Sequence, residues 1–328
     1  MNSARMSTTP VDVAIERVRG VYGRWRRDTP ISEMRADWDR LFPAPAQDVV
    51  LRAESAAGVE VLWVIAPPTA PGEHVPPREA VSRDSMPQRV LLYFHGGGYK
   101  LGSVTSHRDV MARIGAASHC KVLGVNYRLA PEAHFPAPVH DALAVYEWLI
   151  AAGVPPAQIA VGGDSAGGGL AAALLLTLRD LGRAMPAAAV LLSAWTDLTA
   201  QGESYTTRAE ADPIHQRAMI LATARQYLGP DGDAANPLAS PLFGDLAGLP
   251  PLLLQVGDRE TGLDDSTRFA AKARAAGVRA DLEVYADMIH VFQQFAAEIP
   301  QARLAIAAIG RFLLGIWGEA TAEGMRPC

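Results

Sequence analysis

Short hydrophobic runs alternate with longer amphipathic stretches along most of the chain. The continuous apolar runs are typical of strands buried on both faces, and they cover residues 89–94, 121–127, 159–164, 188–193, 252–257 and 281–285. The stretches between them include residues 139–153 and 264–278, where apolar residues have helical spacing. Because strands that alternate with helices form parallel sheets, we predict an α/β fold with a mostly parallel central sheet flanked by helices.

Three regions depart from this alternation. Residues 49–66 read as two strands of a hairpin around residues 55–58. Residues 67–88 are rich in proline and charge and have no periodicity, so we expect a surface loop there. Residues 198–250 contain helical stretches but no clear strand, which indicates an insertion between two core strands.

The N-terminal region predicts one amphipathic helix over residues 11–25. Its apolar residues recur at intervals of three and four, at Val11, Ile15, Val18, Tyr22 and Trp25. Such a helix packs on the core or forms part of a lid over a pocket. We expect residues 1–45 and the insertion at about 198–250 to form a helical cap on a catalytic domain that spans residues 46–328.

Composition narrows the function classes. The 328 residues are 49% hydrophobic, with a formal net charge of −5 and no basic stripe, so we do not expect nucleic-acid binding. The two cysteines have no metal-ligand spacing and form no disulfide framework, which fits a reducing, cytoplasmic compartment. The N-terminus lacks a continuous apolar core of a signal peptide, and no apolar run is long enough to predict a membrane span.

The strongest local motif is Gly163-Asp164-Ser165-Ala166-Gly167, between a predicted strand and a predicted helix. Gly-x-Ser-x-Gly in that context is typical of a nucleophile elbow, a sharp turn that exposes the serine hydroxyl at a helix N-terminus. A glycine-rich turn with an incidental serine is the alternative, and the strand–helix context disfavours it. We therefore interpret Ser165 as a candidate nucleophile.

A nucleophilic serine needs a base, and the base needs an acid that orients it. His290 follows the last predicted strand by a short loop, where sites of open α/β sheets gather. Asp258 and Glu260 lie in the loop after the preceding strand, and both are candidates for the acid. The order serine, acid, histidine is that of the α/β-hydrolases.

Three consecutive glycines follow His95 at the end of the first core strand. A serine that attacks an acyl carbon creates an oxyanion, which needs preorganised donors at about 2.7–3.1 Å. The N–H groups of Gly97 and Gly98 can supply two donors because no Cβ obstructs the approach, and Ala166 can supply a third.

These motifs together resemble the bacterial hormone-sensitive-lipase-like esterases, also called family IV or the GDXG family. The resemblance covers roughly residues 50–315 and rests on His95–Gly98, on NYRLAPEAHFPAPVHD at 126–141 and on GDSAGGGLA at 163–171. It implies an α/β-hydrolase fold with a helical cap and carboxylester hydrolysis without a cofactor or metal. Its motif positions imply Ser165 as the nucleophile and His290 as the base. The oxyanion donors correspond to Gly97, Gly98 and Ala166, and the supporting residues to His95 and Asp164. A structural loop beneath the site corresponds to Tyr127, Arg128, Pro131 and Glu132.

The acid departs from the Asp-Pro-Leu that many relatives carry. By the spacing to His290, the matching residue is Glu260, as in a branch of the family with a similar acidic loop, and Asp258 remains the alternative. Asp212-Pro213 resembles the motif but lies too early in the chain order.

The resemblance implies a serine carboxylesterase for short-chain acyl esters, with a small-molecule ester as its partner. A lactone or acetyl-ester hydrolase, an amidase and a carbamate hydrolase would use the same triad, and a ligand-binding protein without catalysis is a further alternative. An epoxide hydrolase needs a carboxylate where Ser165 stands. A homodimer through the sheet edge near residues 281–285 is also expected, because relatives often pair in this way.

Overall fold

The computed structural model describes residues 8–67 and 89–323. The loop predicted over residues 67–88 therefore lies outside the described residues except for Pro67, as does the start of the N-terminal segment. Within the described residues, the strands form one sheet in the order β1-β2-β4-β3-β5-β6-β7-β8. Their bounds are β1 Val50–Ala56, β2 Val59–Ile65, β3 Val90–Phe94, β4 Lys121–Asn126, β5 Ile159–Asp164, β6 Ala188–Leu192, β7 Leu252–Gly257 and β8 Ala280–Tyr285.

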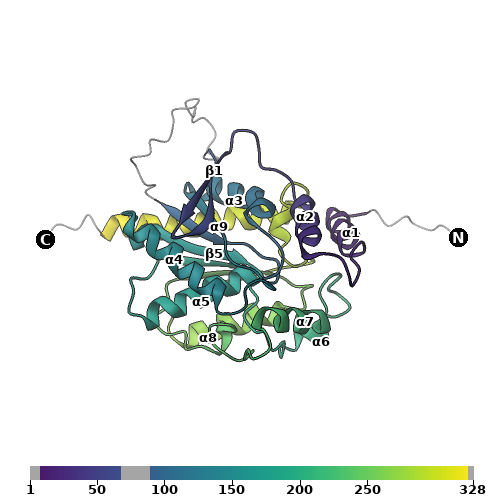
Figure 1. Cartoon of the computed structure of the whole chain (residues 1–328). Coiled ribbons are helices and arrows are strands. Elements are labelled where there is room, and N and C mark those ends of the chain that lie inside the picture. The colour runs from purple at the N-terminus through teal and green to yellow at the C-terminus, as the bar shows by residue number, and fades with distance from the viewer. Residues whose placement is uncertain (1–7, 68–88, 324–328) are drawn as a thin grey trace.

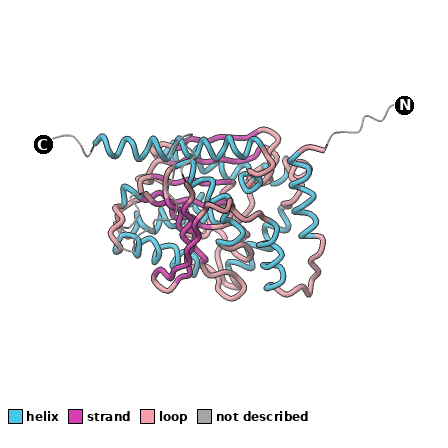
Figure 2. The backbone as a smooth tube through the Cα atoms, turned by 90° about the horizontal axis from the view of Figure 1, so that it is seen from above, coloured by secondary structure: helices cyan, strands magenta, loops and turns pink. Residues whose placement is uncertain are grey.

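The sheet confirms the predicted fold class. The hairpin of β1 and β2 is antiparallel, and β2 pairs antiparallel with β4. All the pairs from β4 to β8 are parallel. Each of the six predicted core strands is present, with bounds that agree within a residue or two. Figure 2 shows the twisted strands in magenta between the helices.

Helices cover both faces of the sheet (Figure 1). Helices α3 and α9 pack together on one face, and α4, α5 and α8 lie on the other. The helices are α1 Pro10–Tyr22, α2 Ile31–Leu41, α3 Val104–Ser118, α4 Ala137–Ala151, α5 Ala166–Asp180, α6 Ser204–Thr207, α7 Arg217–Leu228, α8 Leu263–Ala275 and α9 Pro300–Glu323. Among the described helices, none combines the length and hydropathy needed to cross a membrane.

Strand β3 shows why the core strands read as unbroken apolar runs. Leu92 and Phe94 belong to the hydrophobic core on the α4–α5–α8 side, whereas Leu91 and Tyr93 belong to the core on the α3–α9 side. All four side chains are buried. A strand buried on both faces has no polar side, so the alternation expected of a half-buried strand disappears.

The N-terminal helix is shorter than the periodicity predicts. Helix α1 ends at Tyr22, with Gly23 as its C-cap, so Trp25 lies in the following loop. The ring of Trp25 still packs edge-on against Tyr22, with ring centroids 4.9 Å apart. The apolar spacing therefore identified residues that share one surface, but glycine, a poor helix former, stands where the helix ends.

Helices α1, α2, α6 and α7 gather at one end of the molecule, at the right of Figure 1. The segment between β6 and β7, all of it described, contains α6 and α7 and no strand, as predicted. Side chains of α1, α2 and α7 line the same cavity as Ser165. The assignment of these helices to a cap separate from the catalytic domain stays a prediction.

Candidate active site

Ser165 stands at the turn between β5 and α5. It is the N-cap of α5 and has φ 52° and ψ −120°, a strained backbone conformation for a residue other than glycine. Its N–H donates to the Leu192 carbonyl at 2.9 Å, which holds the turn against β6. A Cβ at Gly167 would overlap the carbonyl of Phe94, so the helix packs this close to β3 only with glycine there. This tight turn presents the Ser165 hydroxyl to a cavity.

A continuous hydrogen-bonded chain links Ser165 to His290 and Glu260. The Oγ of Ser165 lies 2.9 Å from Nε2 of His290. The Nδ1 of the same imidazole lies 2.7 Å from Oε2 of Glu260. Because a carboxylate only accepts, Nδ1 carries the hydrogen and Nε2 is free to accept the serine proton.

Glu260 is held for this contact by two donors on its other oxygen. The Gly257 N–H donates to Oε1 at 2.6 Å, and the Ser193 hydroxyl donates to the same oxygen at 2.7 Å. The Oγ of Ser193 also accepts from the Val291 N–H at 3.1 Å. Sequence analysis missed Ser193, although it follows β6 as Ser165 follows β5.

Asp258, the alternative acid, points elsewhere. Its Oδ1 accepts the N–H of Asp287 at 2.8 Å, and no hydrogen bond joins it to His290 among the described residues. Of the two acids that the sequence left open, only Glu260 contacts the imidazole.

The surroundings of His290 change the pKa of its imidazole in two opposite directions. Burial alone would lower the pKa of His290, but the charge and hydrogen bond of Glu260 outweigh it, so the pKa of His290 is raised above the ordinary 6.5. Glu260 itself is 1% exposed. A buried carboxylate in this position stabilises the charge that His290 acquires when it takes a proton.

The glycine loop after β3 supplies bare backbone beside Ser165. Gly97 has φ +119° and Gly98 has φ +64°, both in the region that favours glycine. A Cβ at Gly97 would overlap the carbonyl of Leu101. Both glycines line the cavity with Ser165, and neither of their N–H groups has an acceptor among the described residues. Ala166 is fully buried at the first position of α5.

His95 supports this loop from below. Its ring stacks on Tyr127 with centroids 4.4 Å apart, and the Tyr127 hydroxyl donates to the His95 carbonyl at 2.6 Å. Its Nδ1 lies 2.8 Å from the Gly96 carbonyl. Burial and the neighbouring His107 lower the pKa of His95 to about 3, so the ring is neutral.

Asp164 also supports the site rather than facing Ser165. It is buried and accepts the Tyr93 hydroxyl at 2.8 Å, and it lies 3.2 Å from Nε2 of His107. That same nitrogen lies 3.2 Å from the Gly96 N–H. Burial opposes the charged carboxylate, but His107 and Tyr93 outweigh it and lower the pKa of Asp164. His107, absent from the sequence prediction, thus joins the elbow to the glycine loop.

The structural loop expected beneath the site is anchored to its neighbours. Arg128 pairs with Asp141 at 2.7 Å. Glu132 accepts two hydrogen bonds from Arg35 of α2, at 2.7 and 2.8 Å. Pro131, by contrast, lines a second groove, between the α1–α2 loop and the end of α7.

Ser165 lines a mostly apolar cavity of about 310 Å³. Aromatic side chains of α1, α2 and the loop between them form one wall, including Tyr22, Trp25 and Trp38. Ile214, Met219 and other residues of the segment between β6 and β7 also line the cavity. An acyl or alcohol group of limited size can therefore be desolvated beside Ser165.

Asp212 ties the segment before α7 to the loop that carries Glu260. Its Oδ1 accepts the N–H groups of Ile214 and His215 at 2.9 and 2.8 Å, and its Oδ2 accepts the Thr261 N–H at 2.9 Å. The ring of His215 packs edge-on against His290, with centroids 4.4 Å apart. The motif that sequence analysis excluded as the acid is thus part of the site as an anchor.

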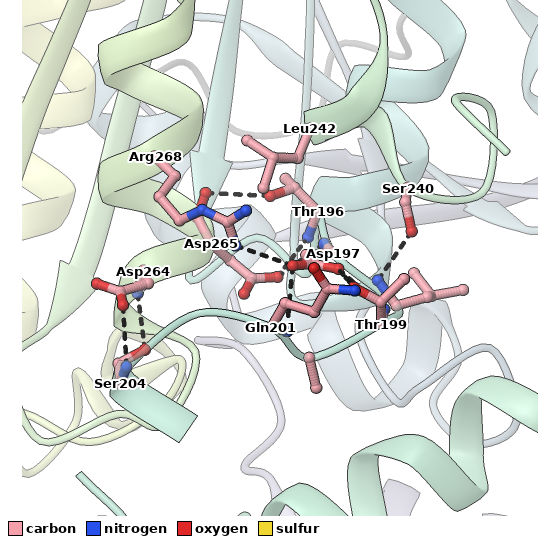
Figure 3. Close-up of polar contacts among 12 residues, drawn as sticks. Thr196, Asp197, Thr199, Gln201, Ser204, Ser240, Leu242, Asp264, Asp265 and Arg268 are labelled. Carbon is pink, nitrogen blue, oxygen red and sulfur yellow. Dashed lines mark hydrogen bonds and ion pairs between the residues drawn. The ribbon is translucent and has the colours of Figure 1, made fainter. Parts of the chain in front are cut away.

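A second hydrogen-bond network joins the start of the segment between β6 and β7 to α8 (Figure 3). Asp265 accepts the N–H groups of Thr196 and Asp197 at 2.8 and 2.9 Å, and Arg268 pairs with Asp197 at 2.9 Å. The Ser204 N–H donates to Asp264 at 2.9 Å. The two acids in the first turn of α8 hold the connection between β6 and α6 in place.

Known proteins share this architecture. A sequence profile of the alpha/beta hydrolase fold family matches residues 91–294. An acetyl-hydrolase of Streptomyces hygroscopicus is 44% identical over 238 residues, which cover 73% of this chain and 78% of that protein. A crystal structure of an esterase from the bacterial hormone-sensitive lipase family is 43% identical and superimposes with a TM-score of 0.84 over 94% of this chain and 98% of that one.

A further solved structure, EstE5 soaked with p-nitrophenyl butyrate, is 38% identical, with a TM-score of 0.81 over 93% of this chain and 99% of that chain. These similarities extend over nearly the whole described chain and include the elements that carry the site. The chain belongs to the alpha/beta hydrolase fold family, in its hormone-sensitive-lipase-like esterase branch.

Proposed function

We propose that this protein is a serine carboxylesterase that hydrolyses short-chain acyl esters through an acyl-enzyme on Ser165. The observation that carries the proposal is the chain from Glu260 through His290 to Ser165, which ends at the cavity wall beside two glycine N–H groups. The names of similar proteins, an esterase and an acetyl-hydrolase, support the same reaction class.

In the first half-reaction, the Ser165 oxygen attacks the acyl carbon and its proton moves to Nε2 of His290. The carbonyl oxygen becomes an oxyanion that accepts hydrogen bonds from the N–H groups of Gly97, Gly98 and Ala166. The ester C–O bond then breaks, and His290 gives the proton to the leaving alcohol.

In the second half-reaction, water attacks the acyl-enzyme. His290 takes a proton from the water, the bond to Ser165 breaks, and His290 returns the proton to the serine oxygen. Glu260 holds the imidazole tautomer and stabilises its charge in both halves. Helices α1, α2 and α7 act in this proposal as the cap that encloses the acyl or alcohol group.

The cavity of about 310 Å³ between aromatic side chains supports the proposed preference for short chains. The test is hydrolysis of p-nitrophenyl esters from C2 to C16 by the wild-type protein. We expect kcat/KM to be highest at C2 to C8 and to fall for longer chains. A maximum at C12 or above would overturn the chain-length proposal, and no hydrolysis at any length would overturn the esterase assignment.

The similarity to an acetyl-hydrolase makes acetyl esters a second candidate within the same mechanism. A maximum confined to C2 in this series, followed by turnover of acetylated alcohols, would favour it. Turnover of a lactone series above that of the best linear ester would favour a lactone hydrolase.

A further inference from the structure

A second groove lies beside the catalytic cavity, between the α1–α2 loop and the end of α7. It has a volume of about 880 Å³ and shares Met34 and Lys100 with the wall of the catalytic cavity. One side comes from residues of the α1–α2 loop and the start of α2, the other from Arg225 and the residues that follow α7, and Pro131 and His134 complete it.

The charge of this groove is unlike that of the chain as a whole. The protein carries a formal net charge of −5, yet none of the described residues that line the groove is Asp or Glu. Four cationic side chains line it: Arg26, Arg27, Lys100 and Arg225. None of the four has an ion-pair partner among the described residues. The nearby Glu132 is already paired with Arg35 at 2.7 Å.

Two further features favour a bound anion in the groove. Helix α2 begins at Ile31, which lines the groove, and its N-cap Pro30 offers no side-chain acceptor, so the positive end of the helix dipole, which Glu33 in the first turn offsets in part, lies in this region. Lys100 is half-buried and close to Arg35, and both burial and this charge lower its pKa. A ligand anion would relieve this concentration of unpaired cations.

Lys100 connects the groove to the chemistry. It follows the glycine loop by two residues, and its N–H donates to the Gly97 carbonyl at 3.2 Å. Because Lys100 and Met34 line both hollows, an anion in the groove lies next to the cavity that holds Ser165. The two hollows together fit one molecule with an apolar ester part and an anionic end.

We propose that this groove binds the anionic end of the ester substrate, a carboxylate or a phosphate, so that the enzyme prefers acidic esters over neutral ones of the same length. This inference rests on the esterase function proposed above and specifies its substrate class. Lys100 and Arg225, which both line the groove, are the specificity-determining residues.

The test compares anionic esters with neutral esters of the same shape. One pair carries the charge on the acyl arm, p-nitrophenyl hydrogen adipate against its terminal amide. A second pair carries it on the alcohol arm, 6-acetoxyhexanoate against 6-acetoxyhexanamide. A third substrate, 5-acetoxypentyl phosphate, separates phosphate from carboxylate. The readout is the ratio of kcat/KM for the anionic ester to that for the neutral ester.

We expect Lys100→Met and Arg225→Met each to lower this ratio by about three- to tenfold in at least one arm, as one partly screened charge pair does. The ratio should also fall in 0.5 M salt. Lys121→Met is the matched control, because Lys121 is a half-buried lysine with a lowered pKa at the opposite end of the sheet, and its ratio should stay that of the wild type.

An unchanged ratio in both groove variants, in every arm, would overturn the inference. Each variant is also measured on the neutral ester, so a loss of folding would lower both rates and leave their ratio unchanged. Arg27→Met, at another cation of the groove, provides a third variant. If the wild-type protein hydrolyses neither the neutral nor the anionic esters, the esterase function fails instead. The groove is then tested by adipate, which should raise the Tm of the wild type more than that of Lys100→Met.

Discussion

Glu260 and Asp258 are two residues apart, but they have different surroundings. Glu260 contacts the imidazole at 2.7 Å, whereas Asp258 accepts the Asp287 N–H. We expect Glu260→Gln to lower kcat/KM for p-nitrophenyl butyrate by about 10³–10⁴, because the amide cannot stabilise the imidazolium. Asp258→Asn, the matched control, should stay within about threefold of the wild type. The reverse order would assign the acid to Asp258.

The raised pKa of His290 predicts a specific pH profile. The imidazole acts as a base only when neutral, so kcat/KM should fall as the pH falls through the raised pKa, above 6.5. In Glu260→Gln the midpoint of the residual activity should move to lower pH, because the carboxylate that raises the pKa is gone. A midpoint below 6.5 in the wild type would contradict this electrostatic account.

Asp265 predicts a pH dependence of stability. Burial and the charge of Asp197 raise the pKa of Asp265 to about 7, above its ordinary 3.8. Its neutral form is therefore favoured in the folded protein, and the associated stability is present below about pH 4 and lost as the pH rises through about 7. We expect Asp265→Asn to raise the Tm relative to the wild type more at pH 7.5 than at pH 5. An equal effect at both pH values would contradict the raised pKa.

At the scale of elements, the turn before α7 is coupled to the catalytic loop by Asp212. In Asp212→Asn, the amide nitrogen cannot accept from Thr261 if the oxygen keeps the bonds to Ile214 and His215. We expect kcat to fall by about 10–100-fold, as when a buried hydrogen bond to a charged group is lost. The exposed Asp231→Asn, in the same inserted segment, is the control and should be near wild type. Equal kcat in both variants would show that the anchor does not act on the chemistry.

The elements that could be predicted from sequence are those with a strong local signal. The core strands have continuous apolar runs because both of their faces are buried, and β3 is an example. Helix α2 escaped prediction because its buried residues are few, with Asp37 among them, and its place depends on partners far along the chain, such as Glu132 bound to Arg35. Long-range contacts of this kind leave little local periodicity.

The same distinction applies to the site. Ser165, His290 and the choice between Asp258 and Glu260 follow from motifs at the ends of strands. Ser193 and His107 were missed because they act by hydrogen bonds between segments that are distant in the chain, 67 residues in the contact of Ser193 with Glu260. Only the folded chain shows which of the acidic side chains reaches the imidazole.

At the scale of the whole molecule, the sheet leaves β8 at an edge. Val284 is 48% exposed there, and an open edge strand favours pairing with a second copy. We therefore predict a homodimer that pairs through this edge. Light scattering after size exclusion should give a mass of about twice 34.9 kDa, and Val284→Lys should lower it. A mass of one chain at micromolar concentration would contradict edge pairing.

The central claim is that Ser165 is the nucleophile, and fluorophosphonate labelling followed by peptide mass spectrometry tests it most directly. The reagent reacts with a serine hydroxyl that an adjacent base activates. We predict one label per chain in the wild type, on the peptide that contains Ser165, and no label in Ser165→Ala or His290→Ala. A wild-type protein that stays unlabelled, or a label that persists in Ser165→Ala, would contradict the account.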